Sequence, residues 1–272
     1  MQSREHCFMA FFILLMNKYI KSVCYYLGYD VKKIKHVRIR EEQIAYGTKV
    51  PLRALHSGFE YEQVEIIRAG TDQHTECAIA HWEFIPFWIK NAEELIESRK
   101  KGIPTFNATA EKLLTSKLFK QAALQRRCIL PVSWFFEWRH ITHAGEKKPE
   151  KIPYCITSQD EDYLLFAGVW QPWTDQQTGE TIDTFAIVTT EANEWMAQIH
   201  NSKKRMPLML TETKAAEWIS TGLKESDIQK ILNTPCNDIP LTAWTIHKNF
   251  RSDADPTSPE HYAQVPAIQP FS

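Results

Sequence analysis

The sequence predicts a single α+β domain in which mostly antiparallel strands form a curved sheet or open barrel, with helices packed around it. Runs of β-branched and aromatic residues alternate along the chain with segments whose apolar residues have helical spacing. No repeat, low-complexity tract or Gly/Ser linker divides the chain. Its 272 residues, 43% hydrophobic and 24% charged, are enough for one sizeable core.

Strands are predicted where β-branched and aromatic residues cluster between turn signals. The segment ECAIAHWEFIPFW at 76–88 ends in a Pro-aromatic turn, and CILPVSWFFEW at 128–138 has the same character. The loop DQQTGE at 175–180 indicates a hairpin between two further strands. The remaining strands are expected at 163–170, 184–190 and 206–210.

Helices are predicted where apolar residues recur every three or four positions. The longest candidate is the segment 112–127, whose apolar positions are Leu113, Leu114, Leu118, Phe119, Ala122 and Ala123. Shorter helices are expected at 191–199, 211–219 and 225–232. The tail at 251–272 contains four prolines, so we expect it to be extended or partly disordered and the domain to span 24–250.

The first 23 residues, MQSREHCFMAFFILLMNKYIKSV, differ from the rest of the chain, and the globular pattern begins at Cys24. Val23 is what a GTG start codon becomes when a longer reading frame is translated, so we expect residues 1–23 to be a non-native or removed extension. A cleaved leader and a genuine N-terminal segment are the alternatives. The apolar run from Phe8 to Met16 is too short to span a bilayer, and no A-x-A-like cleavage site follows it.

A chain that starts at Cys24 carries an amine and a thiol on adjacent carbons. An aldehyde condenses with such an amine to an imine, and the thiol can then close a five-membered thiazolidine. An α-amino group has a pKa of about 7.7–8.0, against about 10.4 for lysine, so far more of it is free base near neutral pH. Taken alone, however, Cys24 is more simply an ordinary buried thiol.

Cysteine spacing and charge exclude several classes of protein. The six cysteines are scattered, with no CxxC pair and no metal-ligand spacing, so a reduced cytoplasmic protein is favoured over a disulfide scaffold. We expect neither a metal nor an organic cofactor. The formal net charge of −1 gives no overall basic field, so nucleic-acid binding requires a local patch.

Four motifs occur in order along the chain: CYY at 24–26, FNATAE at 106–111, WFFEW at 134–138, and Ile199-His200 followed by Arg205-Met206-Pro207. Together they resemble the SRAP (SOS response-associated peptidase) family, whose members shield abasic sites in single-stranded DNA by a covalent DNA–protein crosslink. The resemblance runs from Cys24 to about Phe250. It implies a cysteine exposed after Met removal, and an active constellation of Cys24, Asn107, Glu137 and His200.

Each implied site residue has a chemical reason to be there. His200, with an ordinary pKa of about 6.5, is suited to move the proton that opens an abasic sugar to its aldehyde. Glu137 lies among aromatic residues, and desolvation by them would raise its carboxyl pKa. Asn107 can donate and accept, so it can orient the new N-terminus or the opened sugar. Structural roles are also possible: a helix N-cap for Asn107, a solvent-facing Glu137, and a helix-dipole contact for His200.

Contacts with DNA need aromatic side chains for stacking and cations for phosphate. Trp88, Phe136 and Trp138 resemble the positions at which the family splays bases at the lesion. Local positive charge comes from Lys203, Lys204 and Arg205, with Arg126, Arg127 and Arg139 as weaker candidates. The aromatic residues could instead belong to the core, and the lysines to a solvated turn.

The chain departs from the usual family pattern in three places. Tyr26 stands where an arginine usually follows the cysteine by two positions, and Thr109 replaces the arginine of an Asn-Ala-Arg string. The spacing from His200 to Arg205 is longer by three residues. Two phosphate-binding cations are therefore missing and two lysines are gained nearby, so the cations are expected to have been relocated.

Three classes of function follow from these observations. The first is abasic-site crosslinking, by a cytoplasmic monomer that acts on single-stranded DNA and not at a membrane. The second is a cysteine-dependent peptidase or autoprocessing thiol hydrolase, in which Cys24 attacks a carbonyl with His200 as base and Asn107 as its orienter. The third is a non-catalytic single-strand DNA binder. A Cys24→Ser variant distinguishes them, because only the third function survives it.

Overall fold

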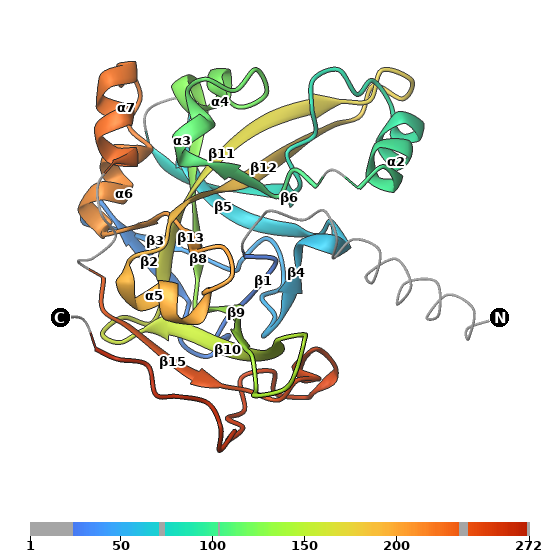
Figure 1. The fold of residues 1–272 in the computed structure, drawn as a ribbon. Coiled ribbons are helices and arrows are strands. Elements are labelled where there is room, and N and C mark those ends of the chain that lie inside the picture. The colour runs from blue at the N-terminus through green and yellow to red at the C-terminus, as the bar shows by residue number, and fades with distance from the viewer. Residues whose placement is uncertain (1–23, 71–73, 103, 234–238, 271–272) are drawn as a thin grey trace.

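A computed structural model describes residues 24–70, 74–102, 104–233 and 239–270 of the chain. The predicted N-terminal extension, residues 1–23, lies outside the described residues. Strands alternate with short helices along the described chain, which confirms the predicted α+β class (Figure 1).

The strands form two large sheets and one small hairpin. In chain order they are β1 (Tyr26–Gly28), β2 (His36–Ile39), β3 (Glu42–Ala45), β4 (His56–Ser57), β5 (Gln63–Ala69), β6 (Thr75–Trp82), β7 (Asn107–Thr109), β8 (Arg127–Val132), β9 (Trp134–Ile141), β10 (Glu150–Ser158), β11 (Leu164–Thr174), β12 (Thr181–Glu191), β13 (Arg205–Pro207), β14 (Met209–Leu210) and β15 (Leu241–Thr245).

The helices are short and lie around the sheets (Figure 1). They are α2 (Ala92–Lys100), α3 (Ala110–Leu113), α4 (Lys120–Gln125), α5 (Glu194–Ile199), α6 (Glu212–Trp218) and α7 (Glu225–Leu232), with 3-10 turns η1 (Gly58–Glu60) and η2 (Phe250–Ser252). Within the described ranges, no helix has the length and apolar character needed to cross a membrane.

Five strands close into a barrel in the order β12-β6-β5-β8-β11, because β12 pairs with β6 on one side and with β11 on the other. The β12–β6 ladder is parallel, and the other four ladders are antiparallel. The predicted loop at 175–180 joins β11 to β12, and the buried side chains of Ile67, Ile129 and Phe185 belong to the core. The prediction of a curved sheet or barrel of mostly antiparallel strands is confirmed.

The second sheet, in the order β15-β10-β9-β1-β4, occupies the lower half of Figure 1. Strand β1 pairs with β4 through Tyr26 and Ser57, and with β9 through Leu27 and Phe135. Both pairings are antiparallel. Residues that precede β1 therefore lie beside residues that follow Phe135, and this brings the start of the described chain to the middle of β9.

The predicted helix at 112–127 is two helices, α3 and α4, separated by a turn. The hydroxyl of Ser116 accepts hydrogen bonds from the backbone N–H groups of Leu118 and Phe119 at 3.2 and 3.4 Å, which stabilises this turn. The apolar spacing is nevertheless correct for burial, since both segments pack against the core. A local side-chain bond to the backbone thus interrupts a pattern that periodicity alone predicts to be continuous.

Two predicted strands are also divided. The segment 128–138 breaks at Ser133, because β8 belongs to the barrel and β9 to the second sheet. The segment 206–210 breaks at Leu208, because β13 pairs with β12 whereas β14 pairs with β11. In both cases the chain changes its hydrogen-bonding partner, which a local hydrophobic pattern does not encode.

The C-terminal tail is extended along the second sheet rather than folded on itself. After η2 its described residues form only an isolated bridge between Ile246 and Pro259. The Trp244 indole donates to the carbonyl of Thr257 at 2.6 Å, and the Tyr262 hydroxyl donates to the carbonyl of Ile246 at 3.0 Å. These bonds hold residues 257–262 against β15 and the residue Ile246 that follows it.

Arg127, a weaker candidate for DNA contact, is a structural residue. Its side chain is buried and donates to the carbonyls of Ala123, Trp218 and Ser220 at 2.7, 2.6 and 2.5 Å. It therefore connects β8 to α4 and to the end of α6. Because its guanidinium is buried and engaged by these carbonyls, it is not available to a phosphate. Burial lowers its pKa to about 10, which still leaves the guanidinium charged at neutral pH.

Replacing Arg127 by alanine is expected to lower the free energy of unfolding by about 3 kcal/mol, because three buried carbonyls lose their donor. Urea denaturation measures this change. Arg126→Ala is the matched control, since the half-buried Arg126 makes one longer bond to the Trp170 carbonyl, at 3.3 Å, and a contact with Gln125. Equal effects of the two substitutions would contradict the assignment.

Candidate active site

Cys24 lies two residues before the start of β1 and is 1% exposed. Its backbone nitrogen donates to Glu137 Oε1 at 2.7 Å, and in the 272-residue chain this nitrogen is the amide of the Val23–Cys24 peptide bond. The φ of Cys24 is +57°, in the left-handed region that non-glycine residues rarely adopt. Such a backbone costs of the order of 1 kcal/mol and persists only where its surroundings hold it. Burial raises the pKa of the Cys24 thiol well above its ordinary value, with a further contribution from Glu137.

Glu137 is a buried carboxyl in the middle of β9. Alternation along β9 directs Phe136 and Trp138 to an aromatic cluster with Phe250, and Glu137 to the opposite face, which is also covered. The solvent-facing alternative is therefore wrong. Desolvation raises the pKa of Glu137 to about 8, although the N–H groups of Cys24 and Trp138 and the charge of Lys203 act in the other direction. The direction agrees with the expectation from its aromatic neighbours.

His200 forms the C-cap of α5, where its N–H donates to the carbonyl of Met196 at 2.8 Å. Its ring Nδ1 accepts the backbone N–H of Arg205 at 3.1 Å, so in the neutral ring the proton lies on Nε2. Nε2 lies 3.8 Å from Glu137 Oε2. Burial lowers the pKa of His200 to about 4, below the ordinary 6.5, so at neutral pH the ring is neutral and presents an N–H to Glu137. Its part in proton transfer stays a prediction.

Asn107 is the first residue of β7, which pairs in parallel with β12. Its Nδ2 donates to the carbonyl oxygen of Cys24 at 3.5 Å. Its Oδ1 is buried and has no hydrogen-bond partner among the residues that the structure describes. The N-cap of α3 is Thr109, so the alternative of a helix cap for Asn107 does not hold.

The four implied residues thus come from four separate elements and meet at one buried point. The carboxyl of Glu137 lies between the nitrogen of Cys24 on one oxygen and the Nε2–H of His200 on the other. Such a carboxyl, with a pKa of about 8, can exchange a proton near neutral pH. Within the described ranges no group of three or more His, Cys, Asp or Glu side chains is arranged to hold a metal ion.

The predicted stacking residues differ in their placement. Trp88 is 51% exposed, and its neighbour Phe87, which the sequence analysis did not select, is 69% exposed. Their rings form an edge-to-face pair with centroids 4.9 Å apart. Phe136 is a correction: it is fully buried and stacks on Phe250 at 4.7 Å, so it has no free face for a base. Trp138 is partly buried against the same cluster.

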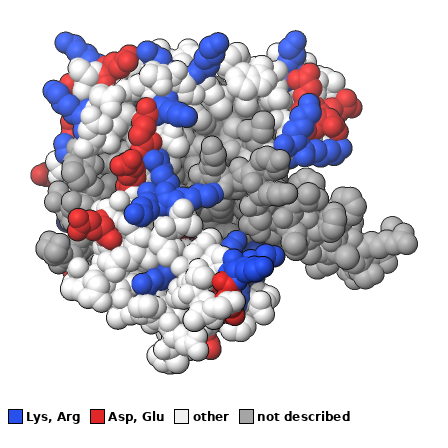
Figure 2. Space-filling model, in the orientation of Figure 1, with Lys and Arg blue, Asp and Glu red and all other residues white. Residues whose placement is uncertain are grey.

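The predicted cations also differ. Lys203 and Lys204 are exposed, whereas Arg205 forms a bidentate ion pair with Glu111 at 2.7 and 3.0 Å and donates to the Thr189 carbonyl. Arg205 is therefore already engaged within the protein, and its predicted contact with phosphate stays a prediction. On the face shown in Figure 2, lysines and arginines form several separate groups with acidic residues beside some of them, and no broad basic patch.

The other two weaker candidates, Arg126 and Arg139, donate to backbone carbonyls, of Trp170 at 3.3 Å and Pro266 at 2.6 Å respectively. A cation that sequence reasoning missed is Arg251, which is exposed in η2. It donates to the hydroxyl of Tyr26 at 3.1 Å, and its guanidinium carbon lies 5.7 Å from the Tyr26 ring centre. The two residues are 225 positions apart, so no local signal could pair them.

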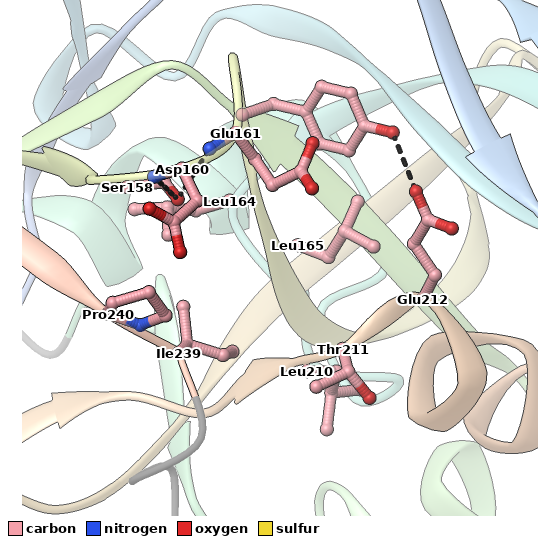
Figure 3. Close-up of a pocket in the computed structure, with 11 residues that line it drawn as sticks. Ser158, Asp160, Glu161, Leu164, Leu165, Leu210, Thr211, Glu212, Ile239 and Pro240 are labelled. Atoms are coloured by element: carbon pink, nitrogen blue, oxygen red, sulfur yellow. Dashed lines mark hydrogen bonds between the residues drawn. The ribbon is translucent and has the colours of Figure 1, made fainter.

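A separate pocket with a volume of 240 Å³ lies on another part of the molecule (Figure 3). Leu164, Leu165 and Leu210 form part of its apolar wall, and Asp160 and Glu212 contribute carboxylates. None of the four site residues lines it. It is therefore distinct from the constellation around Glu137.

Comparisons with known proteins point to one family. Residues 35–252 match the family model described as SOS response associated peptidase (SRAP). The abasic site processing protein YoqW of Bacillus subtilis is 30% identical over 179 residues, which cover 66% of this chain and 72% of YoqW. The abasic site processing protein YoaM of the same organism is 30% identical over 165 residues, covering 61% and 66%. A solved structure from Bacteroides thetaiotaomicron has a TM-score of 0.66 and 31% identity, over 76% of this chain and 85% of that one.

The raised pKa of Glu137 predicts a pH-dependent stability. The folded chain holds this proton up to about pH 8, whereas a carboxyl in the unfolded chain loses it at about pH 4.3. Its stabilising effect is therefore complete below about pH 4.3 and is lost as the pH rises through 8. Relative to Glu137→Gln, the free energy of unfolding of the wild type is expected to fall by a few kcal/mol between about pH 5 and about pH 8.

Urea denaturation at a series of pH values measures this difference. Glu97→Gln is the matched control, because the exposed Glu97 is paired with Lys100 and its pKa is lowered, so its contribution stays constant over this range. If the difference in free energy of unfolding between the wild type and Glu137→Gln is equally constant over this pH range, Glu137 is ionised throughout it.

Proposed function

Because the chain belongs to the SOS response associated peptidase (SRAP) family, we propose that it captures abasic sites in single-stranded DNA through a covalent bond to Cys24. The names of its relatives YoqW and YoaM, abasic site processing proteins, support the choice of substrate. The observation that carries the chemistry is the 2.7 Å bond between the nitrogen of Cys24 and the buried carboxyl of Glu137. Enzymes place a proton acceptor at this distance from an atom that must lose a proton.

The proposed reaction needs a chain that begins at Cys24, because an acylated nitrogen cannot form an imine. In such a chain an ammonium replaces the amide N–H beside Glu137. Opposite charges at this distance lower the pKa of the carboxyl and raise that of the amine. Burial opposes this effect, because it raises the pKa of Glu137, and it thereby favours transfer to Glu137 of the proton that the ammonium must release before it can attack. While residues 1–23 are attached, the nitrogen is an amide and the reaction is blocked.

The atoms balance over three steps. The free amine of Cys24 adds to the aldehyde carbon of the ring-opened sugar, and the adduct loses water to give an imine. The sulfur of Cys24 then adds to the imine carbon, and the thiol proton moves to the imine nitrogen, which closes a thiazolidine. The net change converts an amino-thiol and an aldehyde into a thiazolidine and one water. Glu137 takes a proton from the ammonium and gives it to the departing hydroxyl, which leaves as water. It then takes up the remaining proton of the nitrogen as the imine forms.

The neighbouring residues have supporting roles in this proposal. The Nε2–H of His200 faces Glu137 and stabilises its ionised form when the 3.8 Å gap closes to hydrogen-bond distance. The free Oδ1 of Asn107 can accept a hydroxyl proton of the opened sugar, while its Nδ2 stays on the carbonyl of Cys24. Both roles follow from the donors and acceptors that the protein itself leaves available.

The arrangement disfavours the alternative of a thiol hydrolase. Such an enzyme needs a thiolate beside a basic imidazole. Here burial raises the pKa of the Cys24 thiol and lowers that of His200 to about 4. The Nδ1 of His200 is also occupied by the N–H of Arg205. Neither partner is thus prepared for attack on a peptide carbonyl.

The proposed DNA contacts use the exposed aromatic pair Phe87 and Trp88 and the exposed cation Arg251. Phe87 and Trp88 offer free rings for stacking on bases. Arg251 is linked to Tyr26, two residues after Cys24, and no ion pair of Arg251 occurs among the described residues. We place a phosphate contact there, in the region where Tyr26 replaces the cation of the usual family pattern, rather than at Arg205.

Protein that begins at Cys24 is expected to form an adduct with single-stranded DNA carrying one abasic site, and this adduct should survive heating in detergent. Cys24→Ser keeps the amine but loses the thiol, so it cannot close the thiazolidine and should give no heat-stable adduct. Denaturing gel electrophoresis and intact mass measure both outcomes. Intact DNA of the same sequence is the substrate control.

The same experiment separates the alternatives. Chain beginning at Met1, verified by mass, should not react, and an adduct on that unshortened chain would overturn the role of the Cys24 amine. A Cys24→Ser protein that still forms the stable adduct would exclude the thiol. Equal binding to both DNAs without any adduct would leave only the non-catalytic binder.

Arg251→Ala is expected to weaken binding to intact single-stranded DNA and to reduce the salt slope, d log K/d log[salt], by about 0.7, the value for one phosphate contact. Fluorescence anisotropy at several salt concentrations measures both quantities. Arg205→Ala is the matched control and should leave the slope unchanged, because Glu111 already neutralises Arg205. A reduced slope in Arg205→Ala alone would reverse the assignment.

A further inference from the structure

The distance between Glu137 and His200 depends on how the end of α5 is attached to β9. We infer that two side-chain amides, those of Asn201 and Gln198, are positioning residues that hold His200 against Glu137, and that the C-terminal segment 266–269 completes the attachment. The inference rests on the proposed function for its kinetic consequence. Its structural consequence can be measured without DNA.

Asn201, directly after His200, pairs with the backbone of β9. Its Oδ1 accepts the N–H of His140 at 2.9 Å, and its Nδ2 donates to the carbonyl of the same residue at 2.8 Å. His140 lies three positions after Glu137 on the same strand. Strand β1 pairs with β9 only at Trp134 and Phe135. Beyond these residues the same edge of β9 has no strand partner in the described part of the chain, and the amide of Asn201 forms hydrogen bonds to it at His140.

Gln198, two residues before His200, makes the same kind of pairing with the tail. Its Nε2 donates to the carbonyl of Gln269 at 3.0 Å, and its Oε1 accepts the N–H of that residue at 2.8 Å. Three residues earlier in the tail, the carbonyl of Pro266 accepts a bond from Arg139 of β9 at 2.6 Å. The tail therefore bridges α5 to the strand that carries Glu137.

The two connections act from both sides of His200 and both end on β9 within three positions of Glu137. Each side-chain bond contributes about 1 kcal/mol, so losing one connection leaves the protein folded but frees that end of α5. Proton exchange is sensitive to such a change, because the 3.8 Å separation must close to about 3 Å. The tail lies beyond residue 252, where the match to the family model ends.

Several charged or titratable groups surround His200 and influence the pKa of its ring. Glu137 and His140 approach from β9, Lys203 from the loop after Asn201, and Arg205 from β13. Cys24, bonded to Glu137, contributes a neutral thiol. Burial is the largest cause of the low pKa of His200, so release of α5 lets water reach the ring and raises this pKa.

The test uses Asn201→Ala and Gln198→Ala, made in a chain that begins at Cys24. The ring C2 proton of His200, assigned by its loss in His200→Ala, is titrated by NMR. Both variants are expected to raise the titration midpoint by about one unit or more toward the ordinary value. Gln229→Ala on α7 is the matched control, because Gln229 is exposed and, among the described residues, its side chain bonds to Asn233 at the end of the same helix.

A truncated chain that ends at residue 264 tests the part played by the tail. It lacks Pro266 and Gln269, so its midpoint should rise as in Gln198→Ala. Adding Gln198→Ala to the truncated chain should produce no further change, because the partner is already gone. Full additivity of the two changes would contradict the bridge through Gln198.

The kinetic measurement is the rate of adduct formation as a function of pH. Asn201→Ala and Gln198→Ala are expected to slow it roughly tenfold and to shift its acidic limb, while Gln229→Ala matches the wild type. Wild-type protein that forms no adduct would refute the proposed function, yet the NMR midpoints would still decide the inference. Unchanged midpoints in both variants, or equal shifts in the control, would overturn the inference.

Discussion

The hydrogen bond from the nitrogen of Cys24 to the carboxyl of Glu137 is the contact on which the rest of the site depends. It exists because β1 is inserted antiparallel beside β9, which brings the residues before β1 to the middle of that strand. Both partners are buried, so water competes for neither of them. His200 lies near the carboxyl of Glu137, and Asn107 donates to the carbonyl of Cys24.

Burial moves the pKa values of the two titratable partners in opposite directions. It raises that of Glu137 to about 8 and lowers that of His200 to about 4, so at neutral pH most molecules hold a neutral acid beside a neutral imidazole. An ion pair in this position would have to be desolvated at a cost of several kcal/mol. At neutral pH the buried pair therefore carries one exchangeable proton on Glu137 and no fixed pair of charges.

Much of the fold could be predicted because strand and helix patterns are local. Strands in one α+β domain followed from the aromatic and β-branched runs, and the site residues that the family resemblance implies lie together in the structure. Long-range pairing could not be predicted. Alternation placed Phe136 opposite Glu137 but could not show that Phe250 covers it, and Arg205 gave no local sign of its bond to Glu111, 94 positions away. Similarly, a hydroxyl at Ser116 interrupted a helix whose apolar spacing is regular.

The left-handed backbone of Cys24 has a consequence for a shortened polypeptide. The steric cost of a positive φ arises from the carbonyl group of the preceding residue, here Val23. When Cys24 becomes the first residue, that carbonyl is gone and the torsion no longer exists. A chain that begins at Cys24 is therefore free of this constraint. The terminal nitrogen then gains rotational freedom about its bond to Cα, and its lone pair can turn toward an electrophile while the sulfur stays in place.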